Sequence, residues 1–390
     1  MREPGLITWV IKASKLCNLR CSYCYEWDDL DKKDRIDLEL WRRIFLAVKD
    51  FESLRAALGR DVRSLLVLHG GEPLILPVPY LRQVMALKHE ILGTGKNTPQ
   101  VSLQTNAFSV SDDVIEFLKE TRIRVGISHD IVPGVRLSAR REPVEERVEA
   151  NMERLRAAGV YGGGIVVLAG HTGPKIREVY DWYARRKTPF RVLPLFDGPD
   201  SRPSGYSASS DMVSQALCTL FDHWIATGAE VKIEPFAQQL EWVIQKRLGI
   251  HSRPRDREHE GDSIFLVNTN GDVYHVPDAY EPGFALGNLG TDSLERILAS
   301  EPYRASIERD RALARKYCEG CEYRGSCRGT PLQQSINTGP HTGRCPTVYN
   351  FLQYMEDYLA TAGYGPGELQ ELLMSTRSVP DPTAMSAAAH

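Results

Sequence analysis

Seven of the eight cysteines fall into two groups whose spacing is typical of metal ligands. Cys17, Cys21 and Cys24 have the spacing C-x3-C-x2-C near the start of the chain. Three thiolates suit three irons of a [4Fe–4S] cube, and the fourth iron stays open for another ligand. A structural zinc ion usually takes four ligands, and no His or fourth Cys lies nearby in the sequence. The spacing therefore favours an iron–sulfur cluster with an open iron over zinc or a chance group of buried thiols.

The second group lies near the end of the chain and consists of Cys318, Cys321, Cys327 and Cys345. Four thiolates can hold a second [4Fe–4S] cluster or a tetrahedral zinc ion, and spacing alone leaves both open. Cys218 stands apart from both groups, within a predicted helix. We interpret it as a small core residue.

Composition and charge exclude several classes of protein. The chain has 390 residues, 42% hydrophobic and 25% charged, and a net charge of -3, so it lacks the basic excess typical of nucleic-acid binding. No apolar run approaches the roughly 20 residues of a membrane-spanning helix, and residues 6–11 are too short for a secretory signal core. We therefore expect a cytoplasmic protein with no nucleic-acid or membrane partner, in which clustered thiols bind metal rather than form disulfides.

Short strands that alternate with amphipathic helices must position these cysteines. Strands are predicted at 7–11, 64–68, 101–105, 123–127, 165–168 and 190–193, and helices at 37–58, 144–155 and 211–226, among others. Strands separated by one helix each are typical of a parallel sheet. Six such units predict an α/β fold, a partial (β/α)6 TIM-like barrel with its chemistry at the C-terminal ends of the strands.

The second predicted strand ends in His69-Gly70-Gly71-Glu72-Pro73. Taken alone, two glycines after a strand indicate a turn. Together with the cysteine motif after the first strand, however, this sequence resembles the radical S-adenosylmethionine (SAM) superfamily over residues 1–230. The resemblance implies that the first cluster reduces SAM to methionine and a 5′-deoxyadenosyl radical, which takes a hydrogen atom from a carbon of the substrate.

The resemblance also implies a set of SAM contacts at the strand ends. Gly70 and Gly71 would let the backbone approach the SAM amino group, and Glu72 would balance its charge. Arg140 or Arg141 would pair with the SAM carboxylate, because a guanidinium fork suits a carboxylate. For each polar residue alone, a satisfied hydrogen bond at a strand end is an equal explanation. The implied contacts are Tyr23, His69, Gly70, Gly71, Glu72, Gln104, Asn106, Ser128, Arg141 and Leu195, with Asp130 ending the same strand as Ser128.

The late cysteines and the segment 270–288 resemble a SPASM domain, the extension of many peptide-modifying radical SAM enzymes. A full SPASM domain carries two auxiliary [4Fe–4S] clusters and seven cysteines. This chain has four, because residues 276–278 and Pro331 stand where the family has cysteines. The resemblance therefore implies one auxiliary cluster at Cys318, Cys321, Cys327 and Cys345, and two [4Fe–4S] clusters per chain.

These inferences divide the chain into a radical SAM barrel (1–230), a linker or bridging region (231–265), a SPASM-like iron–sulfur domain (266–365) and a tail (366–390). We expect an enzyme that forms a side-chain cross-link, of cyclophane or related type, in a ribosomally made peptide. The auxiliary cluster would accept electrons from that oxidation. Asp278 is the candidate for proton removal, although a turn aspartate beside Pro277 is the better explanation of this residue taken alone.

Other functions and several partners follow from the same residues. One alternative is a radical SAM dehydrogenase or sulfatase-type maturase that oxidises Ser, Cys or a small sugar. Another is a non-catalytic iron–sulfur carrier or zinc scaffold, but a carrier needs neither an open iron nor a barrel. The expected partners are a precursor peptide and an external one-electron donor of flavodoxin or ferredoxin type. Only 16 residues precede Cys17, so we expect leader recognition by the barrel, the C-terminal domain or a separate leader-peptide-binding protein.

Overall fold

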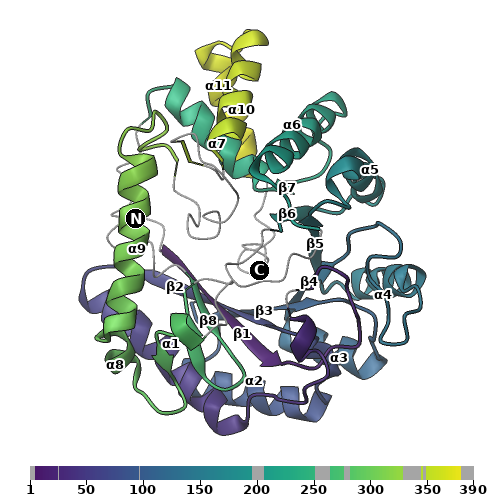
Figure 1. The fold of residues 1–390 in the computed structure, drawn as a ribbon, viewed down its shortest axis with the longest axis vertical. Helices are drawn as coiled ribbons and strands as arrows, with labels where there is room; N and C mark the ends of the chain where they lie inside the picture. The colour runs from purple at the N-terminus through teal and green to yellow at the C-terminus, as the bar shows by residue number, and fades with distance from the viewer. Residues whose placement is uncertain are drawn as a thin grey trace.

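The fold is built on one curved sheet with helices on its outer side (Figure 1). The computed structural model describes residues 5–24, 26–95, 97–195, 206–250, 264–275, 282–327, 344–345 and 348–378. Within these residues the strand order is β10-β9-β8-β1-β2-β3-β4-β5-β6-β7. Neighbouring strands from β8 through β7 are parallel, and β9 and β10 are antiparallel to their neighbours.

The strands are β1 (Gly5–Ser14), β2 (Val62–Gly70), β3 (Gln100–Thr105), β4 (Arg124–Ser128), β5 (Tyr161–Leu168), β6 (Phe190–Pro194), β7 (Ile233–Glu234), β8 (Ile264–Val267), β9 (Asp272–Tyr274) and β10 (Gly287–Asn288). The helices are α1 (Leu38–Ala57), α2 (Val78–Leu92), α3 (Asp112–Thr121), α4 (Glu145–Ala157), α5 (Ile176–Arg185), α6 (Ser210–Ala226), α7 (Phe236–Arg247), α8 (Leu294–Leu298), α9 (Glu301–Cys318), α10 (Tyr349–Thr361) and α11 (Pro366–Ser378). The α/β fold with a parallel sheet is confirmed, and so are the six predicted strands and three named helices, with ends shifted by up to four residues.

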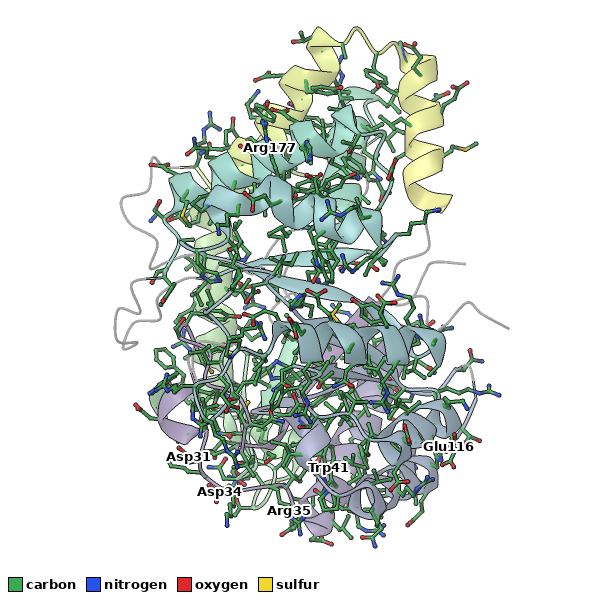
Figure 2. All side chains as sticks on the ribbon, turned by 90° about the vertical axis from the view of Figure 1, so that its right-hand side faces the viewer. Asp31, Asp34, Arg35, Trp41, Glu116 and Arg177 are labelled. Atoms are coloured by element: carbon green, nitrogen blue, oxygen red, sulfur yellow. The ribbon has the colours of Figure 1, made fainter. Side chains whose placement is uncertain are left out.

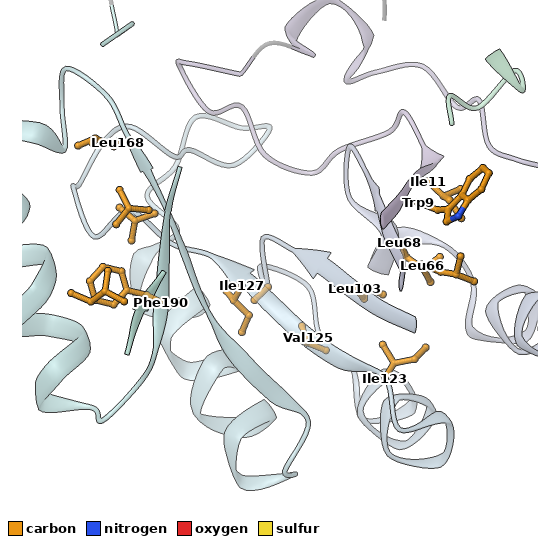
Figure 3. Packing of buried hydrophobic residues seen from close by; sticks show 14 of the residues in the cluster. Trp9, Ile11, Leu66, Leu68, Leu103, Ile123, Val125, Ile127, Leu168 and Phe190 are labelled. Atoms are coloured by element: carbon orange, nitrogen blue, oxygen red, sulfur yellow. The ribbon is translucent and has the colours of Figure 1, made fainter. Parts of the chain in front are cut away.

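Alternation along β1 explains why this strand lies at the centre of the core. Ile7, Trp9, Ile11 and Ala13 point to one face and are buried, and in Figure 3 Trp9 and Ile11 lie beside Leu66 and Leu68 of β2. The Trp9 ring stacks on Phe265 of β8 with 4.5 Å between centroids, and meets Phe51 of α1 edge-on at 6.0 Å. Such aromatic pairs add roughly 1 kcal/mol beyond the area that they bury.

The C-terminal residues continue this architecture. Strand β8 pairs with β1 in parallel register, so the late part of the chain extends the barrel sheet. The expected linker contains β7 and α7, and the start of β8. The tail expected at 366–390 is instead helical up to Ser378, because Leu369 and Leu373, one turn apart, are buried where α11 packs against α7. Half-buried Cys218 packs against the core from α6, as expected.

The chain returns from the first cysteines to α1 along the surface. Figure 2 shows Asp31, Asp34 and Arg35 at one edge of the molecule, with Arg177 of α5 at the far end. Among the helices described, each is too short or too polar to span a bilayer.

The end of β2 lies against the backbone of the cysteine loop, which follows β1. The Gly71 N–H donates to Ser14 O at 2.8 Å, and the Glu72 N–H donates to Leu16 O at 2.9 Å. A Cβ on Gly71 would lie 2.2 Å from Lys15 O, and one on Gly70 would lie 2.2 Å from Ser14 O. Gly70 also has φ = 130°, which favours glycine. The two glycines are therefore needed for the fold itself, whatever they contact in addition.

We expect Gly71→Ala to destabilise the metal-free chain by about 2 kcal/mol, because the new methyl group overlaps fixed backbone atoms. The control is Gly367→Ala at the start of α11, where a Cβ meets nothing within 4 Å. Urea unfolding of the two variants measures the difference. Equal midpoints for both variants would contradict the close approach described here.

Candidate active site

The first three cysteines lie on a single loop after β1. The Cys17 N–H donates to Leu30 O at 3.0 Å, and the Cys24 N–H donates to Cys21 O at 3.0 Å. The Arg20 guanidinium donates to Cys17 O at 3.0 Å and so links two residues within the loop. These contacts fix the loop backbone, so the three thiols keep a defined arrangement at the C-terminal end of β1.

The three thiols are close enough to influence one another electrostatically. Burial raises the pKa of Cys17 to about 12, with further contributions from Glu72 and Cys21. Burial, and then Cys21, raises the pKa of Cys24 to about 12. Burial also raises the pKa of Cys21, although Arg136 opposes the effect. A group that binds all three as thiolates must therefore bring positive charge of its own.

The arrangement of the described residues does not fit a single metal ion. No three His, Cys, Asp or Glu side chains within the described ranges form a group that could hold one ion. Thiolates around one zinc ion lie about 3.8 Å apart, as the zinc–sulfur distance and tetrahedral geometry require. A four-iron cube is larger and spaces its ligands more widely. Within the described ranges neither cysteine group is preformed for a single ion, and the choice between zinc and a cluster rests on the ligand chemistry.

Two N–H groups already face Cys17. The Leu19 N–H donates to Cys17 Sγ at 3.4 Å, and Asn106 Nδ2 donates to the same sulfur at 3.6 Å. Asn106 also donates to Asn18 Oδ1 at 2.8 Å, so its amide is held in place. Donors aimed at a sulfur favour its charged form, which suits a sulfur that binds metal as a thiolate.

Glu72 ties the end of β2 to the end of β3. Its carboxylate is 1% exposed. It accepts hydrogen bonds from Thr105 Oγ1 at 2.7 Å, Asn106 N at 2.7 Å and Leu74 N at 2.9 Å. Burial raises the pKa of Glu72, while these donors oppose the rise. Glu72 is expected beside the ammonium group of SAM. In the structure its carboxylate also joins the end of β2 to the end of β3.

His69 precedes this edge and is neutral at ordinary pH. Burial, and then the positive charge of Lys12, lowers the pKa of His69 to about 4. Lys12 is its register partner on β1 and forms a buried ion pair with Glu26, two residues after Cys24. His69 Nδ1 is buried and has no hydrogen-bond partner among the described residues.

Polar side chains continue the edge over β3 and β4. Gln104 Nε2 donates to Ser128 Oγ at 2.6 Å. A Cβ on Gly126 would lie 2.6 Å from Gln104 Oε1, so this glycine leaves room for the amide. Leu195 closes the edge at β6, where its N–H donates to Leu168 O at 2.9 Å. The residues expected at the strand ends therefore do share one edge of the sheet.

Asp130, after β4, is the centre of a buried charge network. It is 1% exposed and accepts from Tyr23 Oη, from Arg136 Nε at 2.8 Å and from the Val167 N–H at 2.8 Å. Burial alone would raise the pKa of the Asp130 carboxyl, but Arg136 and the other donors hold it well below its usual range. The His171 ring stacks on Tyr23 with 5.0 Å between centroids.

Arg141 and Arg136 differ in burial and in what they face. Arg141 is exposed, and its guanidinium carbon lies over the Trp27 ring, 5.1 Å from the centroid. Arg136 is 8% exposed and faces Asp130, and its charge acts on Cys21 and Glu72. The sequence does not single out Arg136, because the three arginines of this loop look equivalent until the loop is folded.

The late cysteines lie at the C-terminal end of α9 and in the segments that follow it. Cys318 ends that helix, and the Cys321 N–H donates to Cys318 O at 3.2 Å. The Cys327 N–H donates to Tyr323 O at 2.8 Å. Cys345 lies just before α10 and packs against the core, as do Cys321 and Cys327. Asp278 lies outside the described residues, as do the other expected residues at 276–281 and 328–343.

Two family models match the chain. A model for the radical SAM superfamily matches residues 11–183, and a model for SPASM, an iron–sulfur cluster-binding domain, matches residues 259–322. The first range contains the early cysteines, and the second contains Cys318 and Cys321.

Curated proteins are similar over most of the chain. The serine-type anaerobic sulfatase-maturating enzyme of Bacteroides thetaiotaomicron is 22% identical over 388 residues, which cover 91% of this chain and 90% of that protein. The cysteine-type anaerobic sulfatase-maturating enzyme of Clostridium novyi is 24% identical over 334 residues, which cover 81% of this chain and 85% of that protein.

Solved structures share the fold. Native anSMEcpe with bound AdoMet has a TM-score of 0.69 at 19% identity, covering 95% of this chain and 99% of that one. Streptococcus suis SuiB bound to precursor peptide SuiA has a TM-score of 0.58 at 14% identity, covering 84% of this chain and 72% of that one. The chain thus contains a radical SAM domain and a SPASM domain, a combination that implies [4Fe–4S] clusters and S-adenosylmethionine as its cofactors.

Proposed function

We propose that this protein is a radical SAM enzyme that takes a hydrogen atom from a residue of a ribosomally made peptide and forms a side-chain cross-link of cyclophane or related type. The observation that carries the enzymatic part is the early cysteine loop, whose three thiols lie beside a glycine-lined strand edge and a buried arginine. When bound there, the cluster and SAM would supply the 5′-deoxyadenosyl radical that removes the hydrogen atom.

Cys17, Cys21 and Cys24 would hold the catalytic cluster. The loop hydrogen bonds keep the three sulfurs in place, and donors from Leu19 and Asn106 face the Cys17 sulfur. Both features fit three thiolate ligands. The loop carries three cysteines and no fourth, so one iron would stay open for SAM.

SAM would lie along the C-terminal edge of the strands. Gly70, Gly71 and Glu72 would face its amino group, and Gln104, Asn106 and Ser128 its carboxylate and ribose. Tyr23, His69 and Leu195 would complete the site. We assign the arginine at the SAM carboxylate to Arg136, because its Nε is held by Asp130 while both terminal amino groups have no partner among the described residues.

Cys318, Cys321, Cys327 and Cys345 would hold one auxiliary [4Fe–4S] cluster, which would accept electrons from the oxidised peptide. Asp278 stays a prediction for the proton acceptor. The domain division at 230 and 265, the cytoplasmic location, the flavodoxin- or ferredoxin-type donor and a separate leader-peptide-binding protein also stay predictions.

A second candidate is oxidation of a serine or cysteine residue, as in a sulfatase maturase. Its support is the similarity to sulfatase-maturating enzymes over 91% and 81% of this chain. The support for a peptide substrate is common to both candidates, since SuiB was solved with a precursor peptide and anSMEcpe with the Cp18Cys peptide.

Mass spectrometry of a peptide encoded beside the gene and co-produced with the protein separates the two candidates. Cross-linking removes two hydrogen atoms, creates no carbonyl group and blocks fragmentation between the joined residues. Serine oxidation also removes two hydrogen atoms but creates an aldehyde that a hydrazide captures. We expect the cross-link; a hydrazide adduct on Ser or Cys would contradict it and support the second candidate.

Changing Cys17, Cys21 and Cys24 to Ala should abolish 5′-deoxyadenosine formation from SAM, because no cluster with an open iron remains. Iron analysis should fall from about eight atoms per anaerobically reconstituted chain to about four, those of the auxiliary cluster. Cys218→Ala is the control and should keep about eight. SAM cleavage by the triple variant, or about twelve irons in the unmodified chain, would show that the ligand assignment is wrong.

Arg136→Gln should weaken SAM binding by about tenfold or more, the usual loss for a charge-assisted contact. Arg141→Gln is the control and should bind SAM as the unmodified chain does. Because Arg136→Gln leaves the buried Asp130 unpaired, the pair Arg136→Gln/Asp130→Asn separates lost binding from lost stability. Calorimetric titration with SAM measures the affinities, and weaker binding by Arg141→Gln alone would reverse the assignment.

A further inference from the structure

A cluster of charged groups and tyrosines connects the late cysteines to two helices. Lys246, at the end of α7, places Nζ 2.7 Å from Glu322 Oε2 and 2.5 Å from Glu356 Oε2. Glu322 directly follows Cys321, and Glu356 lies on α10, which begins shortly after Cys345. One ammonium group thus joins the loop that carries Cys321 to the helix that follows Cys345.

Two tyrosine hydroxyls also connect the loop of Cys321 and Cys327 to α10, one donated from each segment. Tyr349, at the start of α10, donates from its hydroxyl to Glu322 Oε1 at 2.6 Å. Tyr323, which lies between Cys321 and Cys327, donates to Glu356 Oε2 at 2.6 Å. Each segment therefore supplies one carboxylate and one tyrosine hydroxyl, and Lys246 lies between the two carboxylates. We call these five residues the Lys246 clamp.

Burial distinguishes the Lys246 clamp from an ordinary surface ion pair. Tyr323 is fully buried, the Lys246 and Glu356 side chains are 21% and 18% exposed, and Glu322, at 41%, is the exposed member of the cluster. Lys246 Nζ also lies 4.4 Å from the centroid of the Tyr323 ring, and the Tyr323 and Tyr349 rings meet edge-on at 5.9 Å. Exposed pairs contribute little to stability, but a network with several shared partners is worth more than its separate pairs.

Removal of the ammonium would have a specific consequence. The Glu322 and Glu356 oxygens lie within hydrogen-bonding distance of the same nitrogen, so without it two carboxylates would face each other. Their repulsion would push the loop of Cys321 and Cys327 away from α10, because among the described residues the other side-chain hydrogen bond that each carboxylate makes to the opposite segment comes from a tyrosine.

We propose that Lys246 is a positioning residue for the late-cysteine site, which it holds together by fastening the loop of Cys321 and Cys327 to α10 beside Cys345. The inference rests on the proposed auxiliary cluster at these cysteines. Cys318 and Cys321 are linked by a short turn, whereas Cys345 lies 18 residues beyond Cys327 and next to α10, so an anchor between that helix and the loop would keep Cys345 near the other three. The Lys246 clamp supplies that anchor from α7.

The test uses Lys246→Met, which removes the charge at similar side-chain length, and Lys246→Arg, which keeps it. Lys119→Met is the control, because Lys119 belongs to an exposed pair with Glu116 on α3, with 3.4 Å between the charged atoms. Hydrogen–deuterium exchange of the metal-free full-length chain is followed by mass spectrometry over 318–327 and 349–361. We expect exchange at least about tenfold faster in Lys246→Met, and rates near those of the unmodified chain in the other two.

The second measurement adds each Lys change to the chain with Cys17, Cys21 and Cys24 changed to Ala, so that only late-site iron remains. We expect a chelator to remove this iron at least about tenfold faster from Lys246→Met than from Lys246→Arg. Unchanged exchange in Lys246→Met would overturn the clamp, and faster exchange with unchanged iron release would overturn its role at the metal site. If exchange responds while no chain with the early cysteines replaced binds iron, the proposed auxiliary cluster fails and the clamp stands.

Discussion

The close approach of two backbone segments at the end of β2 is the constraint on which the site depends. Gly70 and Gly71 have no side chain that could keep the cysteine loop away, and the Gly71 and Glu72 N–H groups hydrogen-bond to its backbone directly. Glu72 then fixes this edge to β3 through Thr105 and Asn106. Asn106 in turn donates to the Cys17 sulfur. The loop, the edge and the thiols are therefore one connected unit, and a change in one displaces the others.

Buried charge is compensated throughout this unit. Asp130 is paired with Arg136 and Tyr23, and Lys12 with Glu26. Each pair joins a strand or strand end to the cysteine loop or to the loop after β4. Since an unpaired buried charge is costly, these pairs restrict how the loops can move. Among the described residues, Arg136 is held through Nε by Asp130.

The late-cysteine site is organised by other means. It belongs to segments that meet where α7 and α9 end and α10 runs past them. Its backbone contacts are local turns, and the connection between segments is made by charged and tyrosine side chains around Lys246. The same sheet supports both regions, because β8 pairs with β1 and leads towards β9, β10 and α9. An electron acceptor in this region would be structurally continuous with the barrel.

Local pattern in the sequence determined the strand–helix alternation, the parallel sheet and the two cysteine groups, because hydrophobic period and residue spacing are properties of short segments. The resemblance of the same motifs to the radical SAM superfamily pointed to polar residues at the strand ends. In the structure these residues lie along one edge of the sheet. Tertiary structure alone buried Arg136 against Asp130 while leaving Arg141 exposed. It also showed that Glu72 is bonded to β3, and it formed helix α11 within the expected tail. It also brought Lys246 between Glu322 and Glu356. Each of these depends on contacts between residues far apart in the chain, where a charge or a hydroxyl finds its partner only after the chain has folded.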